Sequence, residues 1–81
     1  MNVQEKKELR IRLLKDLYEW NEETGGRPKQ ITVSVPMNEE EKMNHLAYEY
    51  LNDKRLIDYS AKASSLYFAK ITSSGIDRVE E

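Results

Sequence analysis

The one histidine of the chain, His45, is the side chain best suited to acid–base chemistry, because imidazole titrates near neutral pH. Glu41 and Glu49 lie four residues before and four residues after it, so on a helix both carboxylates would flank the ring. Such neighbours orient an imidazole and favour its charged form. No partner for catalysis accompanies it in the sequence, and we expect a histidine held in a surface ion pair.

Other kinds of reactive site are excluded by residue counts. The chain has no cysteine, which removes disulfides, thiolate metal sites and cysteine nucleophiles. A single histidine cannot form a multi-histidine metal site within one chain. The Gly25-Gly26 pair lacks the pattern of a phosphate-binding loop and marks the end of a helix. We therefore predict a protein without catalytic residues, cofactors or metals.

Basic and amide side chains form the remaining candidate site, a surface for nucleic acid. The side chains that could contact phosphates or base edges are Lys62, Ser64, Ser65, Lys42, Asn44, His45, Arg27 and Lys29. The whole chain has a net charge of −2, so it offers no overall attraction for a polyanion. Residues 39–53 carry five acidic and one basic side chain, whereas residues 54–71 carry four basic and one acidic. Charge therefore favours the second of these segments as a phosphate contact.

Two segments with helical periodicity must position these residues. Residues 4–23 place apolar side chains three and four residues apart, and Gly25 with Pro28 ends the helix. Its stripe consists of Leu9, Leu13, Leu14, Leu17 and Tyr18, widened by Ile11 and Trp20. Residues 39–53 begin after Asn38, a good N-cap, with Glu41 at the third position. The inward stripe predicted for this helix is Met43, Leu46, Ala47, Tyr50 and Leu51.

Three segments read as strands. Residues 30–35 alternate, with Ile31, Val33 and Val35 on one face, and Pro36 ends the strand. Residues 56–63 and 66–71 are predicted to form a hairpin that turns at Ser64 and Ser65. The last strand is apolar on both sides, so the pattern does not decide which face is inward. Thr72 can cap a final short helix.

This order predicts a single α+β domain over residues 1–81 with the order α-β-α-β-β-α and a small three-stranded antiparallel sheet. Two longer helices would cover one face of the sheet. The apolar residues are barely enough for one core, so pairing of two chains into a homodimer would be a natural supplement. Three tyrosines, Tyr48, Tyr59 and Tyr67, are the expected interface residues.

The second half of the chain resembles the winged-helix superfamily, in the form found in small uncharacterised proteins of bacteria and prophages. One phrase is carried by Tyr50, Leu51, Lys54, Leu56 and Ile57, and a second by Lys70, Ile71, Thr72, Gly75, Ile76 and Asp77. The resemblance implies that residues 39–53 take the recognition-helix position and that the hairpin is the wing. A full winged helix has one more helix before the recognition helix, whereas residues 24–38 offer a strand and little room for a helix.

Two functions follow as hypotheses. The resemblance implies a non-catalytic, DNA-associated bacterial or prophage regulator that binds double-stranded DNA as a dimer. The alternative is a protein–protein interaction module that keeps the fold and does not bind DNA, as the acidic segment 39–53 favours. The charged start of the chain and the lack of an apolar run of about 20 residues indicate a cytoplasmic protein without a membrane span.

Overall fold

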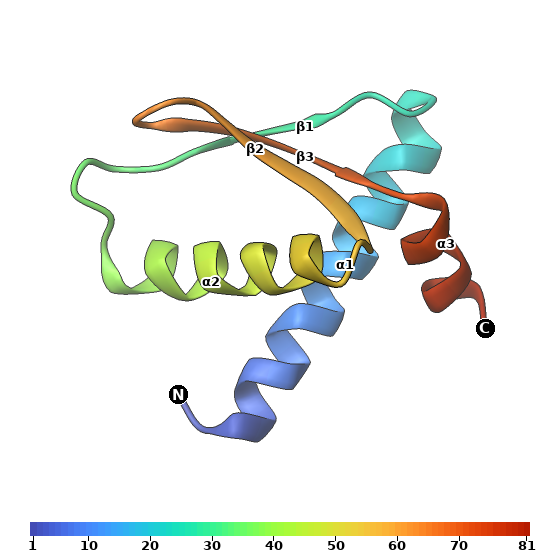
Figure 1. The fold of residues 1–81 in the computed structure, drawn as a ribbon, viewed down its shortest axis with the longest axis horizontal. Helices are drawn as coiled ribbons and strands as arrows, with labels where there is room; N and C mark the ends of the chain where they lie inside the picture. The colour runs from blue at the N-terminus through green and yellow to red at the C-terminus, as the bar shows by residue number, and fades with distance from the viewer.

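The computed structural model describes residues 1–81 and has six elements in the predicted order (Figure 1). They are α1 (Val3–Thr24), β1 (Lys29–Thr32), α2 (Glu39–Asp53), β2 (Ile57–Ala63), β3 (Leu66–Ile71) and α3 (Ser73–Glu80). This α-β-α-β-β-α order with one antiparallel sheet confirms the predicted α+β fold class. No helix forms between α1 and α2. None of the three helices has the length and apolar character that a bilayer span requires.

Both long helices start at reciprocal asparagine–glutamate caps. The Asn2 and Asn38 side chains accept hydrogen bonds from the backbone N–H groups of Glu5 and Glu41, at 2.8 Å in each case. Each glutamate carboxylate accepts the N–H of its asparagine in return. These bonds satisfy N–H groups that the first turn of a helix otherwise leaves free. Gly25 ends α1 in the left-handed conformation, with φ of 70°, as the sequence predicts.

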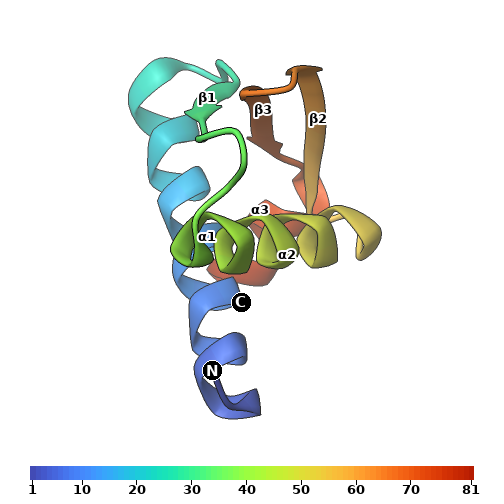
Figure 2. The same ribbon diagram turned by 90° about the vertical axis from the view of Figure 1, so that its left-hand side faces the viewer.

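The sheet has the strand order β1-β3-β2, so the last strand in sequence lies in the centre (Figure 2). Its inward face, which the sequence left open, carries Tyr67, Ala69 and Ile71. Ala69 and Ile71 are 0% and 3% exposed, and Tyr67 stacks on Tyr59 of β2. Leu66, Phe68 and Lys70 therefore point to the outer face of the sheet.

The first strand is shorter than predicted. β1 ends at Thr32, and of the expected inward residues Val33 is buried whereas Val35 is 66% exposed. Thr32 pairs with Leu66, the first residue of β3, so β3 offers no partner for residues further along. The Val33 N–H still reaches the Ser65 carbonyl at 2.9 Å, and the Ser34 N–H turns to the Glu41 carboxylate. The chain thus leaves the sheet for the start of α2.

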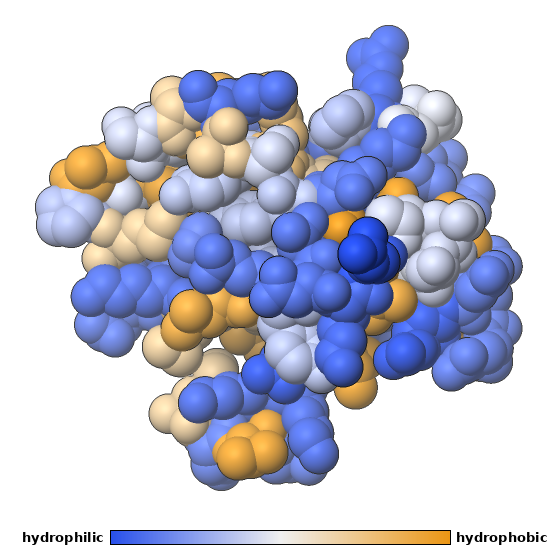
Figure 3. Space-filling model, in the orientation of Figure 1, coloured by the Kyte–Doolittle hydropathy of each residue, from blue (hydrophilic) through white to orange (hydrophobic).

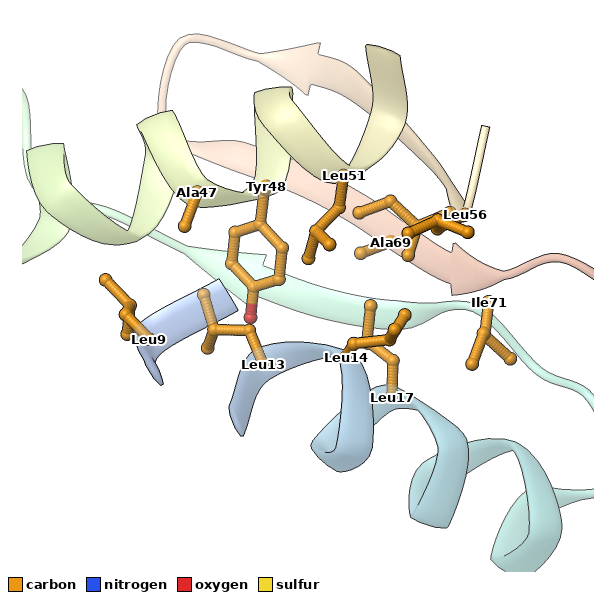
Figure 4. Close-up of a cluster of buried hydrophobic side chains, with 11 residues drawn as sticks. Leu9, Leu13, Leu14, Leu17, Ala47, Tyr48, Leu51, Leu56, Ala69 and Ile71 are labelled. Carbon is orange, nitrogen blue, oxygen red and sulfur yellow. The ribbon is translucent and has the colours of Figure 1, made fainter. Parts of the chain in front are cut away.

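One buried cluster joins both long helices to the sheet (Figure 4). Its eleven members are Leu9, Leu13, Leu14 and Leu17 of α1, Ala47, Tyr48 and Leu51 of α2, Leu56, and Ile57, Ala69 and Ile71 of the sheet. Figure 4 shows the α2 side chains pointing toward the leucines of α1. The predicted leucine stripe of α1 is confirmed, but Ile11, assigned to it, is 56% exposed.

The inward stripe of α2 is rotated from the predicted one. Leu46 and Tyr50, expected in the core, are 56% and 39% exposed, whereas Tyr48, expected at an interface, is only 6% exposed. Tyr48 lies between α1 and the sheet, and its aromatic ring fills more of that space than a leucine side chain would. Burial, together with the negative charge of Asp16, raises the pKa of the Tyr48 hydroxyl. This rotation leaves Leu46 and Tyr50 facing solvent.

The short helix α3 closes the fold through two contacts. Thr72 caps it, accepting the Gly75 N–H at 3.1 Å and donating to the Arg55 carbonyl at 2.7 Å. At the other end of α3, the Tyr18 hydroxyl of α1 donates to the Glu80 carboxylate at 2.7 Å. Both long-range bonds attach α3 to segments far away in the sequence, so the position of α3 depends on the correct packing of the rest of the fold.

We expect Gly75→Ala to destabilise the protein, because Gly75 is buried and packed against backbone. An added Cβ would overlap the Leu56 carbonyl oxygen and would lie 2.6 Å from Cγ1 of Ile71. Overpacking of this kind costs about 1–3 kcal/mol, which urea unfolding can measure. Ser74→Ala, at an exposed neighbouring position, is the control. Equal stability of the two variants would show that α3 shifts freely.

The contact between Tyr18 and Glu80 predicts a loss of stability at high pH. The hydrogen bond to Glu80 raises the pKa of Tyr18 from 10.0 to about 12, so the folded chain favours the neutral phenol. Its contribution is complete below pH 10.0 and is lost as the pH rises through about 12. Tyr18→Phe should therefore be less stable than wild type at neutral pH, and the gap should close in this window. A gap that stays constant would exclude the contact.

Candidate functional site

His45 is held inside the fold by aromatic neighbours. Its Nδ1 atom lies 2.8 Å from the Tyr59 hydroxyl, and its Nε2 atom lies 3.5 Å from the Glu49 carboxylate. Glu49 is thus a neighbour of the ring, as predicted, but His45 is half-buried and does not lie on the surface. Glu41 does not flank the ring, because its carboxylate accepts the N–H groups of Asn38 and Ser34. Those hydrogen bonds lower the pKa of Glu41.

Around His45 the structure forms a stack of tyrosines. The rings of Tyr48 and Tyr59 and those of Tyr59 and Tyr67 are stacked, each pair with centroids 5.1 Å apart. Desolvation by burial is the main cause that raises the pKa of Tyr59 well above its ordinary value. The expectation that these three tyrosines form an exposed interface is wrong for buried Tyr48, and the other two are half-buried against one another. The ring faces that a nucleobase or a partner protein would stack on are already covered by neighbouring tyrosines.

The other candidate residues of α2 are in a poor position to read DNA. Lys42 is exposed and pairs with Glu39 at 3.4 Å, so its charge is largely compensated nearby. Asn44, like His45, is half-buried. The exposed positions of this helix carry mostly acidic and apolar side chains. They are Glu39, Glu40, Lys42, Leu46, Glu49, Tyr50 and Asp53.

The hairpin turn presents a small basic surface. Lys62 and Ser64 are exposed, and the Lys62 ammonium lies 5.8 Å from the centre of the Phe68 ring on the outer face of the sheet. The pairing of β2 with β3 shifts register between Ala61 and Ala63, next to Lys62. Ser65 is half-buried, and its carbonyl accepts the Val33 N–H. The tip therefore offers one free cation and one free hydroxyl.

Arg27 and Lys29 lie at the opposite end of β1 from the hairpin turn. The Arg27 carbonyl accepts the Trp20 indole N–H at 3.0 Å, and the Lys29 ammonium lies 5.8 Å from the Trp20 ring. Lys29 pairs with Ala69, near the end of β3, whereas the hairpin turn lies at the start of β3, between Ala63 and Leu66. Figure 1 shows the hairpin turn and the start of α2 at one end of the molecule, away from this pair. The structure thus does not bring all the predicted phosphate contacts together.

A different surface, which the sequence reasoning missed, lies on the helices around Tyr50. Arg10 of α1 lies over the Tyr50 ring of α2, with its guanidinium carbon 3.8 Å from the ring centre. A groove opens on each side of this contact, and both grooves are lined in part by Arg10 and Tyr50. Figure 3 shows apolar surface on both sides of the notch between α2 and the first turns of α1.

The two grooves differ in charge. Groove 1, of about 360 Å³, lies between α1 and α2 and is lined by Met43, Leu46 and other apolar residues, with Lys6, Arg10, Glu49 and Asp53. Groove 2, of about 440 Å³, lies between α1, α2 and α3 and has only basic charged residues. A second stripe on the first helix, Lys7, Arg10, Ile11, Leu14 and Lys15, signals groove 2 in the sequence. Because Ile11 was placed in the core stripe, this second stripe was not recognised from the sequence.

The His, Asp and Glu side chains form no group of three or more that could hold a metal ion. His45 is committed to its tyrosine and glutamate neighbours.

The chain matches no protein-family model, no curated protein and no solved structure.

Proposed function

We propose that this protein is a non-catalytic protein-interaction module that binds its partner through the helical face around Tyr50. The observation that carries this proposal is the position of the exposed large apolar side chains. Of six, five lie on or beside α1 and α2, namely Met1, Val3, Ile11, Leu46 and Tyr50. All of these except Val3 line the grooves. Apolar side chains gathered along grooves, and rimmed by charges, are typical of a binding surface.

The contact between Arg10 and Tyr50 supports a protein partner. Arginine and tyrosine are the residue types that contribute most to protein interfaces, along with tryptophan. Here the two side chains are in contact with each other between the grooves, so a partner would meet both together. No side-chain hydrogen bond or ion pair within the chain uses the Arg10 N–H groups, so they are available to a partner.

The charge of α2 argues in the same direction. Its first turn carries Glu39, Glu40 and Glu41, and Glu49 and Asp53 follow on its exposed side. Non-specific DNA affinity comes mainly from phosphate contacts, and this helix would repel phosphates.

Two apolar positions test the module. We expect the double substitution Leu46→Asp with Ile11→Asp to abolish retention of partner proteins from an extract of the source cells, because it places charge in both grooves. Ser60→Asp, on the outer face of the sheet, adds charge away from them and should retain the same proteins. All replaced residues are exposed, and circular dichroism checks the fold. Equal retention by wild type and the double variant would overturn the proposal.

A second candidate function is a cytoplasmic, DNA-associated regulator of the winged-helix type that binds double-stranded DNA as a homodimer. The specific observation in its favour is the hairpin: β3 lies between β1 and β2, and the turn presents the unpaired Lys62 at the same end of the molecule as the start of α2 (Figure 1). Two chains would add two such weak basic surfaces on one duplex.

For this candidate, we expect a random duplex to be retarded in a mobility-shift assay at about 50 mM salt, where phosphate contacts are strongest. Lys62→Glu should weaken binding across all sequences, since the contact is to the backbone, whereas Lys7→Glu on α1 should have little effect. No retardation at high micromolar protein would rule out DNA association, and sedimentation would show whether two chains associate.

A further inference from the structure

We propose that groove 2 binds an acidic, amphipathic helix of a partner protein, an inference that rests on the proposed protein-interaction function and specifies its ligand. The groove has an apolar floor, apolar walls and an exclusively basic rim. The floor is formed by Leu14, Leu51 and Leu56, which are 5%, 3% and 7% exposed. The walls include Ile11, at 56% exposed, and half-buried Val79 of α3.

The rim selects negative charge. Lys7, Arg10, Lys15 and Arg78 line the groove, and no aspartate or glutamate does. Lys7, Arg10 and Lys15 make no ion pair within the chain, and Arg78 has only a long, exposed contact of 3.8 Å with Glu81. In a chain of net charge −2, four basic groups around one apolar groove are a marked local excess. Carboxylates on a partner would neutralise them at the rim of the contact.

The dimensions of the groove match a helix. Its α1 side is the stripe from Lys7 to Lys15, which covers roughly 12 Å at 1.5 Å per residue, or about two helical turns. Apolar side chains spaced three and four residues apart on a partner helix would reach the floor over that length. A membrane surface would contact the rim but could not enter a concave groove between three helices, and DNA would leave Ile11 and Val79 uncovered.

A second copy of this chain fits less well. The acidic and apolar side of α2, with Leu46, Glu49 and Asp53, already lines groove 1 opposite Lys6 and Arg10 of the same chain. It is therefore part of a groove and does not project as a ridge. Groove 1 has mixed charge and offers no comparable preference for an acidic ligand.

The probe for groove 2 is a synthetic peptide of about 15 residues with leucines at helical spacing and glutamates on both flanks. We expect micromolar binding by calorimetry, with amide shifts in NMR spectra at Ile11, Leu56 and Val79. Lys15→Glu should weaken binding at least about tenfold. Lys62→Glu makes the same charge change on the hairpin and should leave the affinity unchanged. A peptide with glutamine in place of glutamate should bind at least about tenfold more weakly than the acidic peptide.

Three outcomes would overturn the inference. The first is no binding at millimolar peptide, or shifts confined to groove 1. The second is a concentration-dependent dimer in sedimentation that Lys15→Glu abolishes, which would assign the groove to a second copy. The third is binding of phosphatidylserine vesicles or duplex DNA that Lys15→Glu weakens more than it weakens peptide binding. Failure of the peptide, with loss of partners in the Leu46 and Ile11 double variant, would reject this ligand and leave the module intact.

Discussion

The leucine stripe of α1 is the element on which the rest of the structure depends. Leu9, Leu13, Leu14 and Leu17 are all nearly inaccessible to solvent, and they contact both α2 and the sheet. In a chain of 81 residues no second core can form beside this one. Because a single helix supplies this much of the core, α2, the hairpin and α3 all take their positions from it.

The same constraint explains why apolar surface remains outside. Because α1 contributes only one face to the core, only one stripe of α2 can pack against it. The large ring of Tyr48 occupies the space next to the leucines. Leu46 and Tyr50 are then displaced to the other side of the helix, where Arg10 covers the ring of Tyr50. The binding surface is thus a direct product of how the core is filled. A partner would bury what the small core could not include.

Local signals made much of this fold predictable from the sequence. The cap of α2 forms between Asn38 and Glu41, which are three residues apart, and α1 ends at the residue that follows it, Gly25. The leucine spacing of α1 likewise needs no information about distant segments. The end of β1 is different. The alternation of Val33 and Val35 continues, but strand length depends on where β3 begins, and that register is a long-range property.

The candidate site was harder to predict for the same reason. Whether Tyr48 or Tyr50 faces inward depends on the shape of the space between α1 and the sheet, since both are amphipathic rings on one helix. Groove 2 requires three helices to meet, so the stripe from Lys7 to Lys15 has no visible purpose until α3 is docked beside it. The basic residues that the sequence predicts as phosphate contacts lie at two different ends of the molecule.

The close packing at Gly75 has an evolutionary consequence. The Leu56 carbonyl occupies the place that any larger side chain would need, while that same carbonyl accepts the Thr72 N–H. Mutation at this position is therefore restricted in every descendant that retains α3, whereas the exposed neighbouring position Ser74 is free to diverge. Glycine three residues after the capping threonine, behind a hairpin, should outlast most other marks of shared ancestry in distant homologues.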